Sequence, residues 1–256
     1  MNIRYINLYS DRLCTLDEDF RHTFNFNCRF ICNWMSRNVR KLKLPTDGTF
    51  KFISIDITNR DVQSRLLAEN VFSVPMKWTE NDMNTYLSMK EENTRILFYI
   101  DLLKQGFIEA AKVKDIHLDE LNSLLETFVE NGCKNEWLFK SVRLKDYGVI
   151  LKFNCVFHTY DFELILTVYD LKKNKLAEKV IFKTYPDEIF YSREIRKIVI
   201  EGDTLFINDD FDHHFLSIDL PKLKEGIIDE TILNEDKKPY IFTDDTPDYK
   251  RLRWET

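Results

Sequence analysis

The chain has 256 residues, of which 44% are hydrophobic, and its 43 acidic and 37 basic residues give a formal net charge of −6. This balance disfavours a general nucleic-acid binder, because such proteins gather basic residues to neutralise phosphates. The sequence contains only six Gly and six Pro but 20 Phe and 11 Tyr. This composition excludes a low-complexity chain and indicates one large core or two modest ones.

The first 92 residues predict mixed strands and helices. Residues 3–8 predict a short strand. From Phe24 to Trp34 apolar residues alternate with mostly polar ones, as in a strand, yet Ile31, Met35 and Val39 fit a helical stripe equally well. We expect a strand-like start that gives way to a helix reaching about Arg40, because residues 45–48 (Pro-Thr-Asp-Gly) form a stop.

The pattern continues with short elements. We expect a buried strand, a helical turn and a second short strand at residues 50–57, 62–69 and 71–74. Thr79 is a predicted N-cap, with Asp82 near the first-turn amides, for a helix that continues through Tyr86.

Two amphipathic helices follow. The first has the apolar stripe Ile96, Tyr99, Ile100, Leu103, Phe107 and Ala110, and the second has Leu118, Leu121, Leu124, Leu125 and Phe128. Asn93 or Thr94 is the predicted cap of the first, and Gly132 the left-handed residue after the second. Their short link predicts antiparallel packing.

From Trp137 to Leu220 apolar residues recur at every second position in successive runs, which predicts an antiparallel β meander. Tight turns are expected at residues 172–174 and 201–203. The predicted fold class is α+β, with the meander of the C-terminal half packed against helices of the N-terminal half. The expected parts are an α/β segment (1–92), a helical pair (93–132), the meander (133–220) and an irregular tail (221–256), forming one compact unit.

The five cysteines, Cys14, Cys28, Cys32, Cys133 and Cys155, are scattered and odd in number, which is typical of reduced core residues. The sequence has no secretory signal pattern and no apolar run of membrane-spanning length. We therefore expect a cytoplasmic protein that does not enter a membrane.

Motifs for catalysis are missing from the sequence. It has no Gly-x-Ser-x-Gly, no phosphate loop and no dinucleotide fingerprint, so no catalytic residue and no cofactor is predicted. His22, His117 and His158 stand alone in the sequence and are interpreted as structural or surface residues. The basic residues Arg37, Arg40, Lys41 and Lys43 could contact phosphate, but cations are also expected at the end of a helix.

One charged stretch lies between two predicted strands, at residues 208–214 (Asn-Asp-Asp-Phe-Asp-His-His). Its candidate partner-binding residues are Asp209, Asp210, Asp212, His213 and His214. No metal is predicted, because neighbouring side chains in a short loop splay apart; the alternative is a metal held by Asp210, Asp212 and His214.

Three stretches, residues 74–78, 97–107 and 181–186, resemble immunity proteins encoded beside bacterial polymorphic toxins. The resemblance implies a small non-enzymatic protein that binds and neutralises one cognate toxin. The acidic balance also suits a cationic protein partner, such as a toxin domain. The rival hypothesis is a carboxylate- or metal-dependent hydrolase acting on the open face of the meander.

Overall fold

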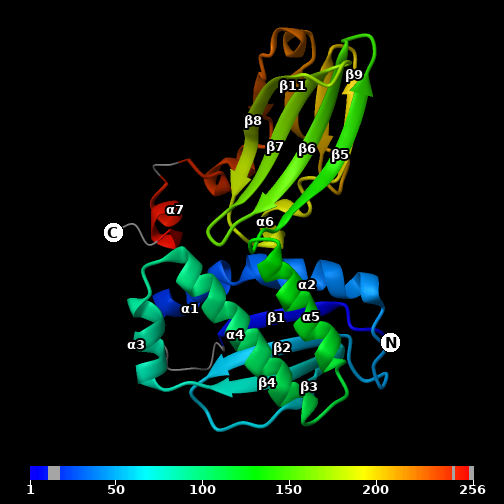
Figure 1. Ribbon diagram of the computed structural model, residues 1–256. Helices are drawn as coiled ribbons and strands as arrows, with labels where there is room; N and C mark the ends of the chain where they lie inside the picture. The colour runs from blue at the N-terminus through cyan, green and yellow to red at the C-terminus, as the bar shows by residue number, and fades with distance from the viewer. Residues whose placement is uncertain (11–17, 244–245, 254–256) are drawn as a thin grey trace. The chain divides into compact units, whose positions relative to one another are not determined.

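The computed structural model describes residues 1–10, 18–243 and 246–253 (Figure 1). Contacts along the chain group into two compact units, one covering Met1–Asn135 and the other Glu136–Arg253. The sequence suggested a single unit, whereas the contacts form two groups, each with its own buried core. The boundary falls where the last helix of the first unit gives way to the first strand of the meander.

The first unit is built on a four-stranded sheet with the order β1-β2-β4-β3. Strands β1 (Tyr5–Ser10), β2 (Phe52–Thr58) and β4 (Val71–Lys77) run parallel, and β3 (Arg65–Leu67) pairs antiparallel with β4. The strands predicted at 3–8, 50–57 and 71–74 are therefore present. The helical turn expected at 62–69 is wrong, because β3 and a short 3₁₀ helix, η1 (Ala68–Asn70), occupy most of that stretch.

The strand-like start expected from Phe24 is also wrong. Helices α1 (Glu18–Asn27) and α2 (Arg29–Leu42) follow one another almost without interruption. Phe24, Cys28 and Ile31 are fully buried at helical spacing, so the tertiary core selected the helical stripe over the alternating pattern. Arg40 and Lys41 lie in the last turn of α2, where cations favour the helix dipole.

Helices α3 (Glu80–Ser88), α4 (Glu92–Ala111) and α5 (Leu118–Glu130) complete the first unit. Thr79 is the N-cap of α3, as predicted, and the structure adds a reciprocal capping box with Asp82; Gly132 adopts a positive φ after α5, also as predicted. Helix α4 starts at Glu92, and Glu91 is its N-cap residue. Asn93 and Thr94, the expected caps, therefore lie inside the helix. Figure 1 shows α4 and α5 crossing one face of this unit's sheet.

The second unit contains two antiparallel four-stranded sheets. One is β5 (Glu136–Leu144), β6 (Val149–Phe157), β7 (Phe162–Asp170) and β8 (Lys175–Thr184) in sequence order. The other has the order β12-β11-β10-β9 and is built from β9 (Lys197–Glu201), β10 (Thr204–Asn208), β11 (His214–Asp219) and β12 (Glu230–Ile232). The strands predicted from the period-2 pattern are therefore present, and the predicted α+β class is confirmed.

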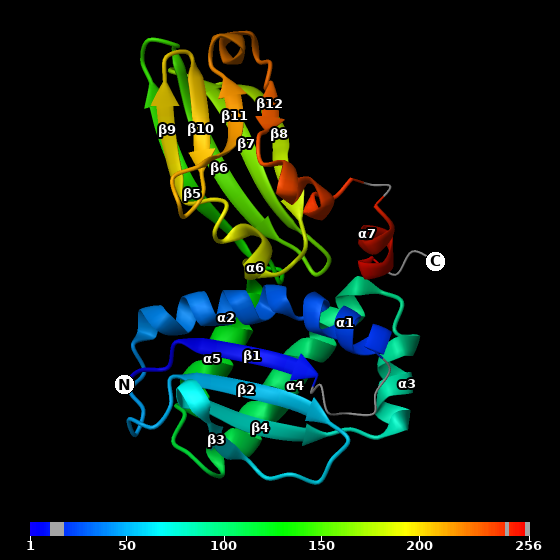
Figure 2. The same ribbon diagram turned by 180° about the vertical axis from the view of Figure 1, so that it is seen from behind.

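The buried face of the β5–β8 sheet is covered by the second sheet, which lies across it in both views (Figures 1 and 2). Phe182 of β8 and Phe215 of β11 meet with their ring centroids 5.0 Å apart. Helix α6 (Glu188–Tyr191) closes one end of this core, where Tyr191 stacks on Phe162 at 3.6 Å. From the sequence we expected helices to cover this face. In the structure the second half of the predicted meander covers it, because both sheets carry one apolar face.

The segment after Leu220 contains more regular structure than the sequence predicted. It forms the 3₁₀ helices η2 (Pro221–Glu225) and η3 (Glu235–Tyr240), the edge strand β12 and helix α7 (Pro247–Leu252). Backbone pairing of β12 with β11 fixes this segment to the sandwich. Within the described ranges, no helix combines the length and the apolar character needed to cross a membrane.

Candidate functional site

The charged loop between β10 and β11 is held in one conformation by Asp209. Its Oδ1 accepts hydrogen bonds from the backbone N–H groups of Phe211 (2.8 Å) and His213 (2.9 Å). Its own N–H donates to the carbonyl of His213 at 3.0 Å. Burial raises the pKa of Asp209, but the hydrogen bonds from His213 and Phe211 outweigh it and leave that pKa below its usual value. Asp209 therefore supports the loop from inside.

The tip of this loop presents an aromatic side chain to solvent. Phe211 is 71% exposed, and the side chain of His213 beside it is 76% exposed. Asp212 adopts a left-handed φ of 62°, and the Asn208 side-chain amide donates to the Asp212 carbonyl at 3.1 Å. An apolar ring on a fixed loop loses little conformational entropy on binding, so this tip suits a protein contact.

The remaining residues predicted at this site face different partners. Asp210 forms an ion pair with Arg196, and Asp212 pairs with Lys197 at 2.9 Å. His214 Nδ1 donates a hydrogen bond to Asn208 Oδ1 (3.0 Å), and its ring stacks on Phe206. The alternative metal ligands Asp210, Asp212 and His214 are thus each engaged elsewhere. The loop has fewer free negative charges than its sequence suggests.

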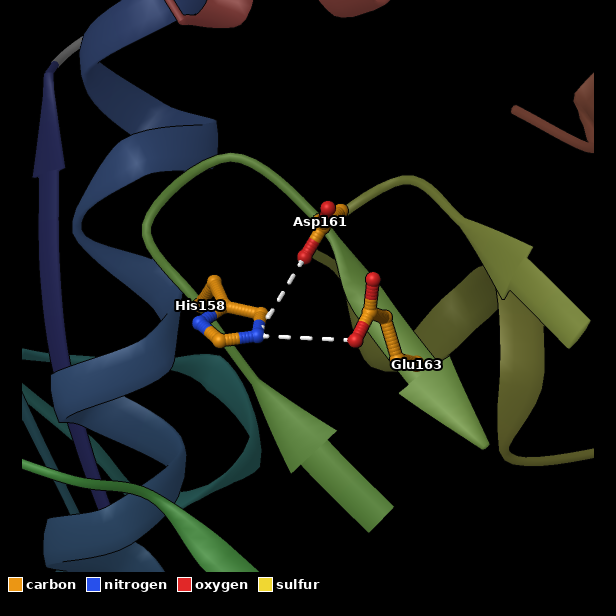
Figure 3. A group of neighbouring side chains, drawn as sticks. All are labelled: His158, Asp161 and Glu163. Carbon is orange, nitrogen blue, oxygen red and sulfur yellow. Dashed lines mark ion pairs between the residues drawn. The ribbon is translucent and has the colours of Figure 1, made fainter. Parts of the chain in front are cut away.

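A second group of side chains gathers at the turn between β6 and β7 (Figure 3). His158 Nε2 lies 4.0 Å from Asp161 Oδ1 and 3.7 Å from Glu163 Oε2. The turn is closed by a 2.8 Å hydrogen bond from the His158 N–H to the Asp161 carbonyl. Asp161 and Glu163 flank the buried Phe162, so strand alternation directs both carboxylates to the face opposite that ring. We name His158, Asp161 and Glu163 the β6–β7 cluster.

Lys183 of β8 lies on the outer oxygens of this cluster. Its Nζ is 3.2 Å from Asp161 Oδ2 and 3.4 Å from Glu163 Oε1, and it donates to the Tyr249 hydroxyl at 2.5 Å. Burial raises the pKa of Asp161, although His158 and Lys183 oppose the rise. The neighbouring His158 lowers the pKa of Glu163. The two carboxylates therefore differ sharply in environment.

The sequence interpretation of His158 as an isolated histidine is wrong. The available signal was the spacing His-x2-Asp-x-Glu at the end of one strand and the start of the next. A tight hairpin brings such residues together, whereas a longer loop would not. Lys183 and Tyr249 are 20 or more positions further along the chain, and only the sheet and α7 place them here.

Other candidates have structural roles. His22 packs edge-on against Phe26, and the His117 ring contacts the Pro45 carbonyl at 2.7 Å. The buried Cys28 donates to the Leu8 carbonyl. No disulfide joins Cys28, Cys32, Cys133 and Cys155 to one another, and Cys14 lies outside the described residues. Arg37 donates to Asn135, and Lys41 donates to Asn38.

Searches against protein-family models, curated proteins and solved structures found no match to this chain. The candidate sites therefore stand on their geometry.

Proposed function

We propose that the chain is a non-enzymatic protein-binding module whose anchor is the β10–β11 loop. The observation that carries this proposal is the exposed Phe211 ring on a loop fixed by Asp209. Interfaces draw much of their free energy from a few aromatic anchors that enter pockets on the partner. His213 lies beside the ring and adds a polar contact at its edge.

The class of partner follows from the sequence. An immunity-type inhibitor that neutralises a cognate toxin agrees with the resemblance of residues 74–78, 97–107 and 181–186. The net charge of −6 favours encounter with a cationic partner. This attraction comes from the surface as a whole and not from the loop, because Asp210 and Asp212 of the loop already form ion pairs with Arg196 and Lys197. We place the protein in the cytoplasm, in keeping with the four described cysteines, which no disulfide joins to one another.

The test uses the product of a toxin gene adjacent to the gene for this chain. The dissociation constant is measured by isothermal titration calorimetry for the parent, Phe211→Ala and Ile189→Ala. Ile189 is 69% exposed and belongs to the same unit, so it controls for general loss of apolar surface. We expect Phe211→Ala to weaken binding at least tenfold, equivalent to about 1.4 kcal/mol or more, and Ile189→Ala to leave it unchanged.

Two results would contradict the proposal. The first is that the parent protein neither binds the product of the adjacent toxin gene nor protects cells that express it. The second is that Phe211→Ala and Ile189→Ala weaken binding equally. Circular dichroism of both variants shows whether the fold is retained.

A second candidate, a metal-dependent hydrolase, is favoured by the β6–β7 cluster. The cluster joins an imidazole and two carboxylates at the turn between two strands, and Lys183 lies beside it. Turnover of a generic phosphoester or ester substrate that disappears in Glu163→Gln would support this activity over a purely binding role.

A further inference from the structure

We infer that His158, Asp161 and Glu163 form a binding site for one divalent transition-metal ion of the Zn²⁺ class. Each residue offers one ligand atom, and the three atoms all lie within 4.8 Å of one another. This inference is independent of partner binding at the β10–β11 loop and is carried by the geometry at the turn between β6 and β7.

The spacing of the ligand atoms suits a small tetrahedral ion. Metal–ligand bonds of about 2.1 Å place tetrahedral ligand atoms about 3.4 Å apart. His158 Nε2 lies 3.7 Å from Glu163 Oε2 and 4.0 Å from Asp161 Oδ1, which is about 0.3 and 0.6 Å more than that separation. Three protein ligands with a fourth position for water is a common zinc arrangement. One imidazole with two carboxylates is compatible with Zn²⁺ and Mn²⁺.

A second observation points to a cation at the same place. The Asp161 side chain is 1% exposed, and its Oδ1 has no hydrogen-bond partner among the described residues. This atom is the one that a dashed line joins to His158 in Figure 3. An unsatisfied buried carboxylate oxygen is costly, and a metal ion at the centre of the cluster would satisfy it.

Lys183 holds the two carboxylates of the site in place. Its Nζ contacts Asp161 Oδ2 and Glu163 Oε1, so the oxygens that face His158 are left for the ion. Outer hydrogen bonds of this kind orient metal-binding carboxylates. The lysine charge also reduces the negative charge offered to the ion. We therefore expect affinity weaker than that of closed structural zinc sites.

Solvent can deliver an ion to the cluster. The His158 side chain is 38% exposed, so its ring is accessible from outside. Glu163 and Lys183 also line a surface hollow together with Phe242 and Thr243 of the segment that follows η3. The ring of His158 stacks on Tyr160 with a 6° interplanar angle, which restricts its orientation.

The test measures Zn²⁺ binding to the metal-free full chain by isothermal titration calorimetry and mass spectrometry of bound metal, with Mn²⁺ as a parallel probe. The variants are His158→Ala and Glu163→Gln, and His213→Ala is the matched control because that histidine is exposed in the same unit. We expect one Zn²⁺ per parent chain, at least tenfold weaker binding in the two cluster variants, and parent-like binding in His213→Ala.

A stability readout separates loss of a ligand from loss of the fold. Zn²⁺ is expected to raise the Tm of the parent and of His213→Ala, and to raise the Tm of His158→Ala and Glu163→Gln much less, because only the folded site binds the ion. No Zn²⁺ or Mn²⁺ binding by a folded parent would overturn the inference. So would parent-like binding by folded His158→Ala and Glu163→Gln, which would place the metal elsewhere.

Discussion

At the scale of single residues, one buried carboxylate determines how the β10–β11 loop is presented. The sequence offered five polar residues there as equivalent candidates. In the structure, Asp209 is internal, whereas the ring of Phe211, which was not a candidate, is the exposed group. The hydrogen bonds that make this difference join side chain to backbone within a loop, and residue types alone do not reveal them.

Asp209→Ala is expected to destabilise the protein by about 1–2 kcal/mol at pH 7, because two backbone donors lose their acceptor. The pKa of Asp209 is lowered in the folded state, so its stabilising effect is present above the unfolded value of about 4 and is lost as the pH falls through the folded value. The difference between parent and variant in urea unfolding should therefore shrink from pH 6 to pH 2.

The matched control for this prediction is Asp212→Asn in the same loop. The Asp212 side chain is 68% exposed and pairs with an exposed lysine, so its replacement should change the free energy of unfolding by less than about 0.5 kcal/mol. Equal effects of Asp209→Ala and Asp212→Asn, or a pH-independent effect of Asp209→Ala, would show that Asp209 does not support the loop.

At the scale of elements, the contact of α4 with β2 depends on the missing side chain of Gly106. A Cβ at this position would lie 2.6 Å from the Cδ1 atom of Ile55, which is fully buried in β2. Alanine favours a helix over glycine by about 1 kcal/mol. The close approach therefore explains a residue that helix propensity alone would disfavour.

Gly106→Ala is expected to lower the free energy of unfolding by about 1–3 kcal/mol, because overpacking of the core exceeds the gain in helix propensity. Ile55→Val removes one of the clashing groups and should by itself cost about 1 kcal/mol. Chemical denaturation of the single and double variants measures the coupling. The double variant should be less destabilised than the sum of the singles, and simple additivity would contradict the proposed contact.

At the scale of the whole molecule, each unit has its own core. The two sheets of the second unit bury apolar faces against each other, with Leu151, Leu166 and Ile218 fully buried. The first unit buries its sheet beneath helices. Such self-contained cores are typical of segments that fold as units.

A fragment covering residues 136–256 is accordingly expected to fold alone, with a β-type circular dichroism spectrum and a cooperative thermal transition. A second fragment covering residues 1–135 should give a mixed helix and strand spectrum. A soluble 136–256 fragment without a cooperative transition would show that its core is insufficient by itself.

Local pattern by itself determined much of this protein: the period-2 runs predicted strands, the stripes of α4 and α5 predicted helices, and Thr79 predicted the N-cap of α3. Those features depend on neighbours within one or two turns of chain. Tertiary structure decided between strand and helix at Phe24, because burial outweighed an ambiguous periodicity. It also divided the predicted meander into two facing sheets and placed Lys183 and Tyr249 beside His158. Apolar alternation shows that a strand has a buried face but does not identify what covers it, and a cluster of charges from distant strands exists only once the sheet has formed.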